Sequence, residues 1–100
     1  MFFLVLAPDA PGMLERRLAL RQEHVDYWQA LGGTVKVAGA MLSSDSEDAS
    51  AVGSSFLLEA ADESAVRRLM AADPFTTGGV FDNDVQIQAV RPAIGAWRPS

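Results

Sequence analysis

Residues 13–31 read MLERRLALRQEHVDYWQAL, and their side chains recur at the spacing of an amphipathic helix. One side of this helix is a solvated polar face, and the opposite side has two apolar edges. Between those edges lie Arg17, Arg21, His24 and Trp28, spaced i, i+4, i+7 and i+11. Charged side chains are almost never fully buried without a partner. The stripe therefore predicts a polar pocket where a sheet-covering helix normally carries leucine.

The composition limits the class of protein. A chain of 100 residues suits one domain, and 49% hydrophobic with 21% charged residues indicates a globular protein. The formal net charge of -5 argues against nucleic acid and anionic membranes as partners. Because Arg16, Arg17 and Arg21 concentrate positive charge on one helix, we expect a small anionic ligand.

The absence of cysteine excludes disulfides, thiolate metal sites and cysteine nucleophiles. With a single histidine as well, no metal site is expected. The apolar opening MFFLVLA has no basic flank and ends at Pro8, so it is too short for a signal peptide or a membrane span. We therefore expect a soluble, cytoplasmic protein. No glycine-rich nucleotide-binding motif occurs, and no cofactor is expected.

Outside the first helix the chain alternates strand and helix signals. Apolar runs rich in aromatic and branched residues predict strands at 2–7, 34–42, 53–60 and 80–90, the last interrupted near 82–84. A second helix is predicted from an N-cap at Asp62 to about Ala72, and Pro74 ends it. We expect the acidic segment 43–52 to be a solvated hairpin loop and 76–79 to be a turn-rich loop.

The order βαββαβ predicts an α+β, ferredoxin-like fold, in which an antiparallel sheet carries two helices on one face. We place one domain at residues 1–90 and an irregular arm at 91–100, anchored by Trp97. The first and third strands are apolar on both faces, so the face without helices needs a cover as well. A homodimer that packs sheet to sheet is the simplest cover, and Trp97 could lock across its interface.

His24 and Asp73 are the candidate catalytic pair. The inward stripe of the second helix, Val66, Leu69 and Met70, continues at Asp73, just as His24 lies on the inward stripe of the first. A buried carboxylate needs a partner, and an Asp that orients a His gives a general acid/base pair. Nearby arginines favour the neutral, proton-accepting form of the histidine. The alternatives are a core histidine and an Asp-Pro turn.

Arg17 and Arg21 have two interpretations. They hold a substrate carboxylate or phenolate by bidentate hydrogen bonds, for which the guanidinium group is well shaped. Alternatively, they neutralise Asp73 or Glu59 as a structural ion pair. The residues do not decide between these interpretations.

Three functions follow from these interpretations. The first is a cofactor-independent enzyme that catalyses a lyase- or isomerase-type step, with His24 and Asp73 as its catalytic pair. In this enzyme Arg17, Arg21, Trp28 and Phe75 bind the substrate, and Tyr27 helps to exclude water. The second is a non-catalytic ligand-binding or accessory module. The third is a structural dimer whose polar stripe is a buried ion-pair network.

The sequence resembles the YciI-like (YCII-related) proteins, small bacterial members of the dimeric α+β barrel superfamily. The likeness rests on MFFLVLA followed by PDAPG, on RRLALRQEH, on VAGAML, on the strand start Gly53-Ser54 and on MAADPFTTGGVF. The resemblance implies a ferredoxin-like protomer that dimerises through its sheet, with a His-Asp pair at His24 and Asp73. One branch of the family is similar to ring-cleavage-pathway dehydrochlorinases, which act on hydroxylated aromatics.

Two departures from the family pattern concern the rim of the pocket and the tail. Ala40 stands where the family often has proline after Ala-Gly, and the chain ends on AVRPAIGAWRPS. The resemblance therefore does not assign a substrate.

Overall fold

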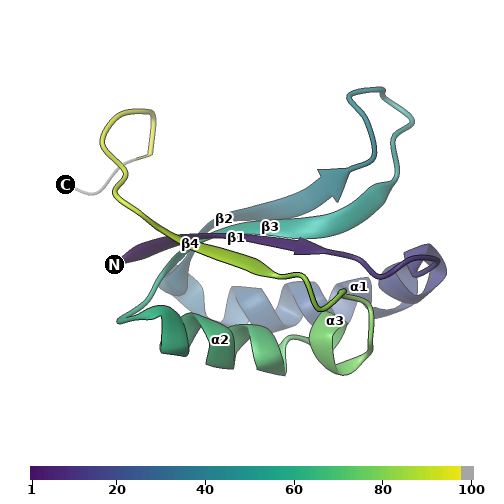
Figure 1. Cartoon of the computed structure of the whole chain (residues 1–100), viewed down its shortest axis with the longest axis horizontal. Helices are drawn as coiled ribbons and strands as arrows, with labels where there is room; N and C mark the ends of the chain where they lie inside the picture. The colour runs from purple at the N-terminus through teal and green to yellow at the C-terminus, as the bar shows by residue number, and fades with distance from the viewer. Residues whose placement is uncertain (98–100) are drawn as a thin grey trace.

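The computed structural model describes residues 1–97, which form a four-stranded antiparallel sheet with helices on one face (Figure 1). The elements are β1 (Phe2–Pro8), α1 (Leu14–Ala30), η1 (Gly32–Thr34), β2 (Val35–Leu42), β3 (Ala51–Glu59), α2 (Glu63–Ala72), α3 (Pro74–Thr77) and β4 (Gln86–Val90). The strand order is β2-β3-β1-β4. This confirms the α+β, ferredoxin-like class.

β1 lies inside the sheet, where β3 and β4 both pair with it antiparallel. Its side chains alternate between the two faces, as strand geometry requires. Phe3 and Val5 are buried beneath the helices, whereas Leu4 and Leu6 are 47% and 42% exposed on the other face. The sheet therefore has one covered face and one open apolar face.

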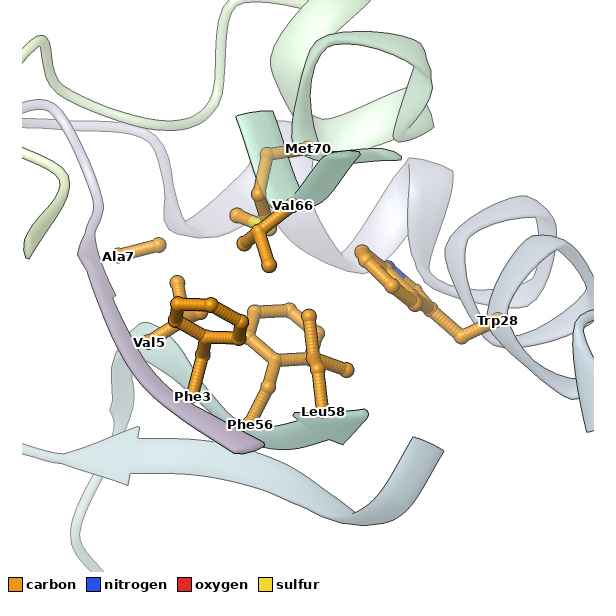
Figure 2. Packing of buried hydrophobic residues seen from close by; sticks show 8 residues of the cluster. All are labelled: Phe3, Val5, Ala7, Trp28, Phe56, Leu58, Val66 and Met70. Carbon is orange, nitrogen blue, oxygen red and sulfur yellow. The ribbon is translucent and has the colours of Figure 1, made fainter. Parts of the chain in front are cut away.

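The hydrophobic core fills the space between the sheet and the helices (Figure 2). It consists of Phe3, Val5 and Ala7 from β1, Phe56 and Leu58 from β3, Trp28 from α1, and Val66 and Met70 from α2. α2 buries two apolar residues, Val66 and Met70, whereas one of the two residues that α1 buries is charged, Arg17, and Leu18 of α1 is 62% exposed. No helix among residues 1–97 is long and apolar enough to cross a membrane.

The segment after α2 differs from its prediction. Pro74 begins the short helix α3 instead of leading into a loop, because a proline fits the first turn of a helix and Asp73 caps it. The last strand is also shorter than the predicted 80–90. Val80 is completely buried and donates its N–H to the Phe75 carbonyl, and Phe81 makes only an isolated bridge to Asp9. Regular pairing starts at Gln86.

The arm after β4 rises on the side of the sheet opposite the helices and forms a loop at one end of the sheet (Figure 1). Trp97 packs edge-on against Phe2, with ring centroids 5.4 Å apart, and the Lys36 ammonium lies 5.8 Å from the Trp97 ring. These are contacts within one chain. The remainder of the predicted arm, 98–100, lies outside the described residues.

Candidate functional site

The two long helices bring His24 and Asp73 together. His24 lies in the second half of α1, and Asp73 directly follows α2. The Nδ1 atom of His24 is 2.8 Å from Oδ1 of Asp73, a hydrogen bond between residues 49 positions apart. Both helices cover the same face of the sheet (Figure 1), and the side chains of His24 and Asp73 are only 12% and 0% exposed.

Asp73 is completely buried, and three groups surround its carboxylate. Trp28 donates its indole N–H to Oδ2 at 2.8 Å, and the Phe75 backbone N–H donates to Oδ1 at 2.9 Å. These two groups can only donate, so both carboxylate oxygens act as acceptors. With Asp73 ionised, its carboxylate can only accept, and the proton in the third hydrogen bond is then carried by His24 Nδ1. This tautomer leaves Nε2 of His24 as the proton acceptor of the ring.

The His24 ring is also held by aromatic neighbours. Phe75 stacks on it, with a centroid distance of 3.9 Å and an interplanar angle of 12°. Phe56 and Phe81 approach its edge. Phe75 is completely buried and is not on the cavity wall, so it supports the histidine from behind.

Arg17 is 5% exposed and forms a fixed network. Its Nε and Nη2 atoms donate to the two carboxylate oxygens of Asp9 at 2.7 and 3.0 Å. Nη2 also donates to the Ser54 hydroxyl at 2.8 Å. The ion-pair partner of Arg17 is therefore Asp9, whereas Glu59 pairs with Lys36 at 3.1 Å.

Sequence reasoning missed Asp9 and Ser54. The position of Asp9 depends on the path of the loop after β1, where its N–H bonds to the Val52 carbonyl. Ser54 carries a signal that could have been used. It is two residues before the core residue Phe56 in β3, and alternation therefore points it toward the helices.

Arg21, one turn after Arg17, is solvent-exposed. No carboxylate within salt-bridge distance of Arg21 is found in residues 1–97. It faces the same cavity as Arg17, His24 and Trp28. The structure thus separates the two arginines, since one is paired inside the protein and the other is available to a ligand.

The cavity lies between α1 and the strands β2 and β3 and has a volume of about 450 Å³. It is lined by Arg17, Arg21, His24, Val25, Trp28, Gln29, Gly32, Val35, Ala38, Gly39, Ala40 and Ser54. Ala38 and Ala40 of β2 are small, so this part of the sheet does not fill the space beneath α1. Ala40, the departure from the family pattern, lies on this wall.

Tyr27 lies next to the pair without lining the cavity. Its hydroxyl donates to the Leu69 carbonyl of α2 at 2.7 Å. Burial, and then the negative charge of Asp73, raise the pKa of Tyr27 above its ordinary value of 10.0. Among residues 1–97, no group of three or more His, Asp or Glu side chains is placed to hold a metal ion.

A ferredoxin-like sheet that carries a hydrogen-bonded His-Asp pair beside a polar cavity defines a small α+β protein. The chain belongs to the YCII-related domain family, whose model matches residues 1–92. It is 32% identical to protein YciI of Escherichia coli over 88 residues, which cover 83% of this chain and 90% of that protein. An uncharacterized protein of Haemophilus influenzae is 29% identical over 86 residues, or 81% and 88% of the two chains.

The chain is also similar to a solved enzyme, the 5-chloro-2-hydroxyhydroquinone dehydrochlorinase of Burkholderia phenoliruptrix in complex with 2,5-dihydroxybenzoquinone. The TM-score is 0.85 and the sequence identity 26%, over 93% of this chain and 96% of the enzyme. The predicted family and fold are therefore confirmed.

Proposed function

We propose that this protein is a cofactor-independent enzyme that moves a proton on a small anionic metabolite, hydroxylated aromatics included, in a lyase- or isomerase-type step. His24 is the general acid/base and Asp73 orients it. The observation that carries the proposal is the 2.8 Å His24–Asp73 hydrogen bond on the wall of a cavity that also contains Arg21.

The chemistry needs a base that is neutral before it accepts the proton and whose protonated form is then stabilised. Nε2 of His24 accepts a proton from the substrate, and the Asp73 carboxylate stabilises the imidazolium that forms. An isomerisation returns this proton to another atom of the substrate, whereas an elimination also releases a leaving group. Arg21 binds the negative charge of the substrate. Its guanidinium group is available for this because no carboxylate in residues 1–97 pairs with it.

The substrate class is supported by the cavity and by the enzyme of similar structure. A volume of about 450 Å³ accommodates a single ring with polar substituents. The similar dehydrochlorinase was solved with 2,5-dihydroxybenzoquinone, a planar ring with acidic hydroxyl groups. Trp28 adds an aromatic surface to the cavity wall, against which such a ring can pack.

The proposal is tested by titrating 2,5-dihydroxybenzoquinone into the protein and by following chloride release from a chlorinated hydroxyhydroquinone. We expect His24→Ala and Asp73→Asn to abolish turnover, and Arg21→Ala to weaken binding. Arg68→Ala is the matched control, because Arg68 is an exposed arginine on α2 outside the cavity. Full turnover in a folded His24→Ala variant would contradict the acid/base role. Binding by the wild-type protein without turnover of any such ring would favour the non-catalytic ligand-binding module.

We propose in addition that the open face of the sheet is covered by a second copy of this chain. Leu4, Leu6 and Val37 are exposed there, and Leu57 lies next to them in a shallow apolar groove. Burial of such a face is favourable, and closed twofold dimers are the commonest oligomers. Sedimentation should give a dimer for the wild-type protein and a monomer for Leu6→Lys. A monomeric wild-type protein at micromolar concentration would contradict the dimer.

A further inference from the structure

Ser54 is the one residue with a hydroxyl group among those that line the cavity. It lies on the helix-covered face of β3 and is 2% exposed. Its neighbours in the sheet are Ala7 on β1 and Ala40 on β2, both of them small. Ser54 is therefore almost entirely buried, yet it is one of the residues that line the cavity.

The hydrogen bonds of Ser54 leave its proton unassigned. A serine hydroxyl has one O–H donor and two acceptor lone pairs, whereas a guanidinium group can only donate. Because Arg17 Nη2 donates to Oγ at 2.8 Å, the Ser54 proton is not used in that contact. In residues 1–97 the hydrogen bond of Ser54 Oγ is the one that it accepts from Arg17, and none is found in which Oγ donates. A ligand oxygen in the cavity would provide an acceptor.

We propose that Ser54 donates a hydrogen bond to an oxygen atom of the ligand, either a phenolate or enolate oxygen or a quinone carbonyl. This inference rests on the proposed function, because it assigns a second ligand-binding group to the same cavity. Arg17 strengthens the donor. When Oγ accepts a hydrogen bond from a cation, its own O–H bond becomes more polarised and donates a stronger hydrogen bond. Asp9 holds Arg17 in place through two hydrogen bonds.

The polar groups of the cavity then have different roles. Arg21 supplies a full positive charge at an exposed position, Ser54 supplies a directional donor at a buried one, and His24 supplies the base. Arg17 acts through Ser54 and is a positioning residue. A ring with oxygen atoms at more than one position, such as 2,5-dihydroxybenzoquinone, can engage more than one of these groups.

The experiment is calorimetric titration of 2,5-dihydroxybenzoquinone into the wild-type protein, Ser54→Ala, Ser54→Thr and Ser55→Ala, with thermal unfolding to verify the fold. Ser54→Ala should raise Kd about tenfold or more, the usual effect of losing a hydrogen bond to a charged group. Ser54→Thr keeps the hydroxyl group and should retain most of the affinity. Ser55 is the matched control, since its hydroxyl donates to the Gly39 carbonyl and it borders the open-face groove.

The outcomes separate this inference from the function on which it rests. If Arg21→Ala weakens binding but Ser54→Ala binds as tightly as the wild type, the Ser54 assignment is wrong and the proposed function stands. Equal losses in Ser54→Ala and Ser54→Thr would also overturn it, because side-chain size and not the hydroxyl group would then govern binding. If the wild-type protein binds no hydroxylated ring, both proposals are wrong.

Discussion

The cavity has two walls that differ in how their polar groups are satisfied. In the paired wall, formed by His24 and Trp28 with the buried Asp73 behind them, all three carboxylate hydrogen bonds are made within the protein. In the open wall, formed by Arg21 and Ser54, donors have no protein acceptor in residues 1–97. Under the proposed function, the acid/base geometry exists before a ligand arrives, whereas ligand recognition uses the groups that folding leaves free.

The largest effect should come from removing the carboxylate of the paired wall. Asp73→Ala leaves the indole N–H of Trp28 and the backbone N–H of Phe75 buried without acceptors. Breaking a buried charged network of this kind costs about 3–5 kcal/mol of the free energy of unfolding. Urea-induced unfolding measures this loss.

The control for Asp73 is another aspartate that caps a helix. Asp62 caps α2 through one hydrogen bond to the Ala65 N–H, 2.8 Å long, and it is exposed. Asp62→Ala should therefore cost only about 1 kcal/mol. Similar losses in the two variants would mean that Asp73 is a helix cap and little more.

The second-largest loss of stability is expected for one of the two arginines and not for the other. Arg17→Met leaves the Asp9 carboxylate, whose side chain is only 8% exposed, without its bidentate partner. We expect a loss of about 2–3 kcal/mol, less than for the completely buried Asp73 because the site adjoins the cavity. Arg21→Met removes an exposed side chain and should change stability by no more than about 0.5 kcal/mol.

For ligand affinity we expect the opposite: the arginine that matters little for stability, Arg21, should matter most. Arg21→Met should lose most of its affinity for 2,5-dihydroxybenzoquinone while it remains as stable as the wild type. The measurements are urea-induced unfolding and calorimetric titration on the same preparations. An Arg21→Met variant that is unfolded, or that binds as the wild type does, would remove the distinction between the two walls.

The sequence allows most of the fold to be predicted because its strongest patterns are local. The two-sided apolar strand at 2–7 and the inward stripe of α2 depend on periodicity alone, and the structure has both. The strand predicted at 80–90 was too long because a turn occupies its first residues. The apolar Val80 suits a strand, but it closes the turn after α3 by bonding to Phe75.

The candidate site is predictable where it depends on helix faces and not where it depends on loops. His24 lies on the inward face of α1, and Asp73 directly follows α2 in continuation of its inward stripe, so helices that cover the same sheet face bring the two residues together. The partner of Arg17 could not be deduced, because Asp9 is held by backbone hydrogen bonds of the loop that follows β1. The sequence also could not show which of the two arginines is ion-paired, since that depends on the contact between Arg17 and Asp9.

The smallest expected effect concerns Tyr27, the one tyrosine of the chain, which reports on the charge of the paired wall. Burial and the Asp73 carboxylate raise the pKa of Tyr27 above 10.0, because both disfavour the tyrosinate anion. The unfolded chain then ionises at a lower pH than the folded one. The stability contributed by this shift is fully present below pH 10.0 and is lost as the pH rises through the raised pKa.

Asp73→Asn removes the negative charge and should lower the pKa of Tyr27, which stays above 10.0 because burial is the larger cause. Tyrosinate absorbance as a function of pH measures this pKa without interference from another tyrosine. Asp62→Asn, at the opposite end of α2, should leave the titration unchanged. The same titration curve in Asp73→Asn and the wild type would mean that Tyr27 does not sense a charge on Asp73. The paired wall would then lack the anion that is needed to stabilise a protonated His24.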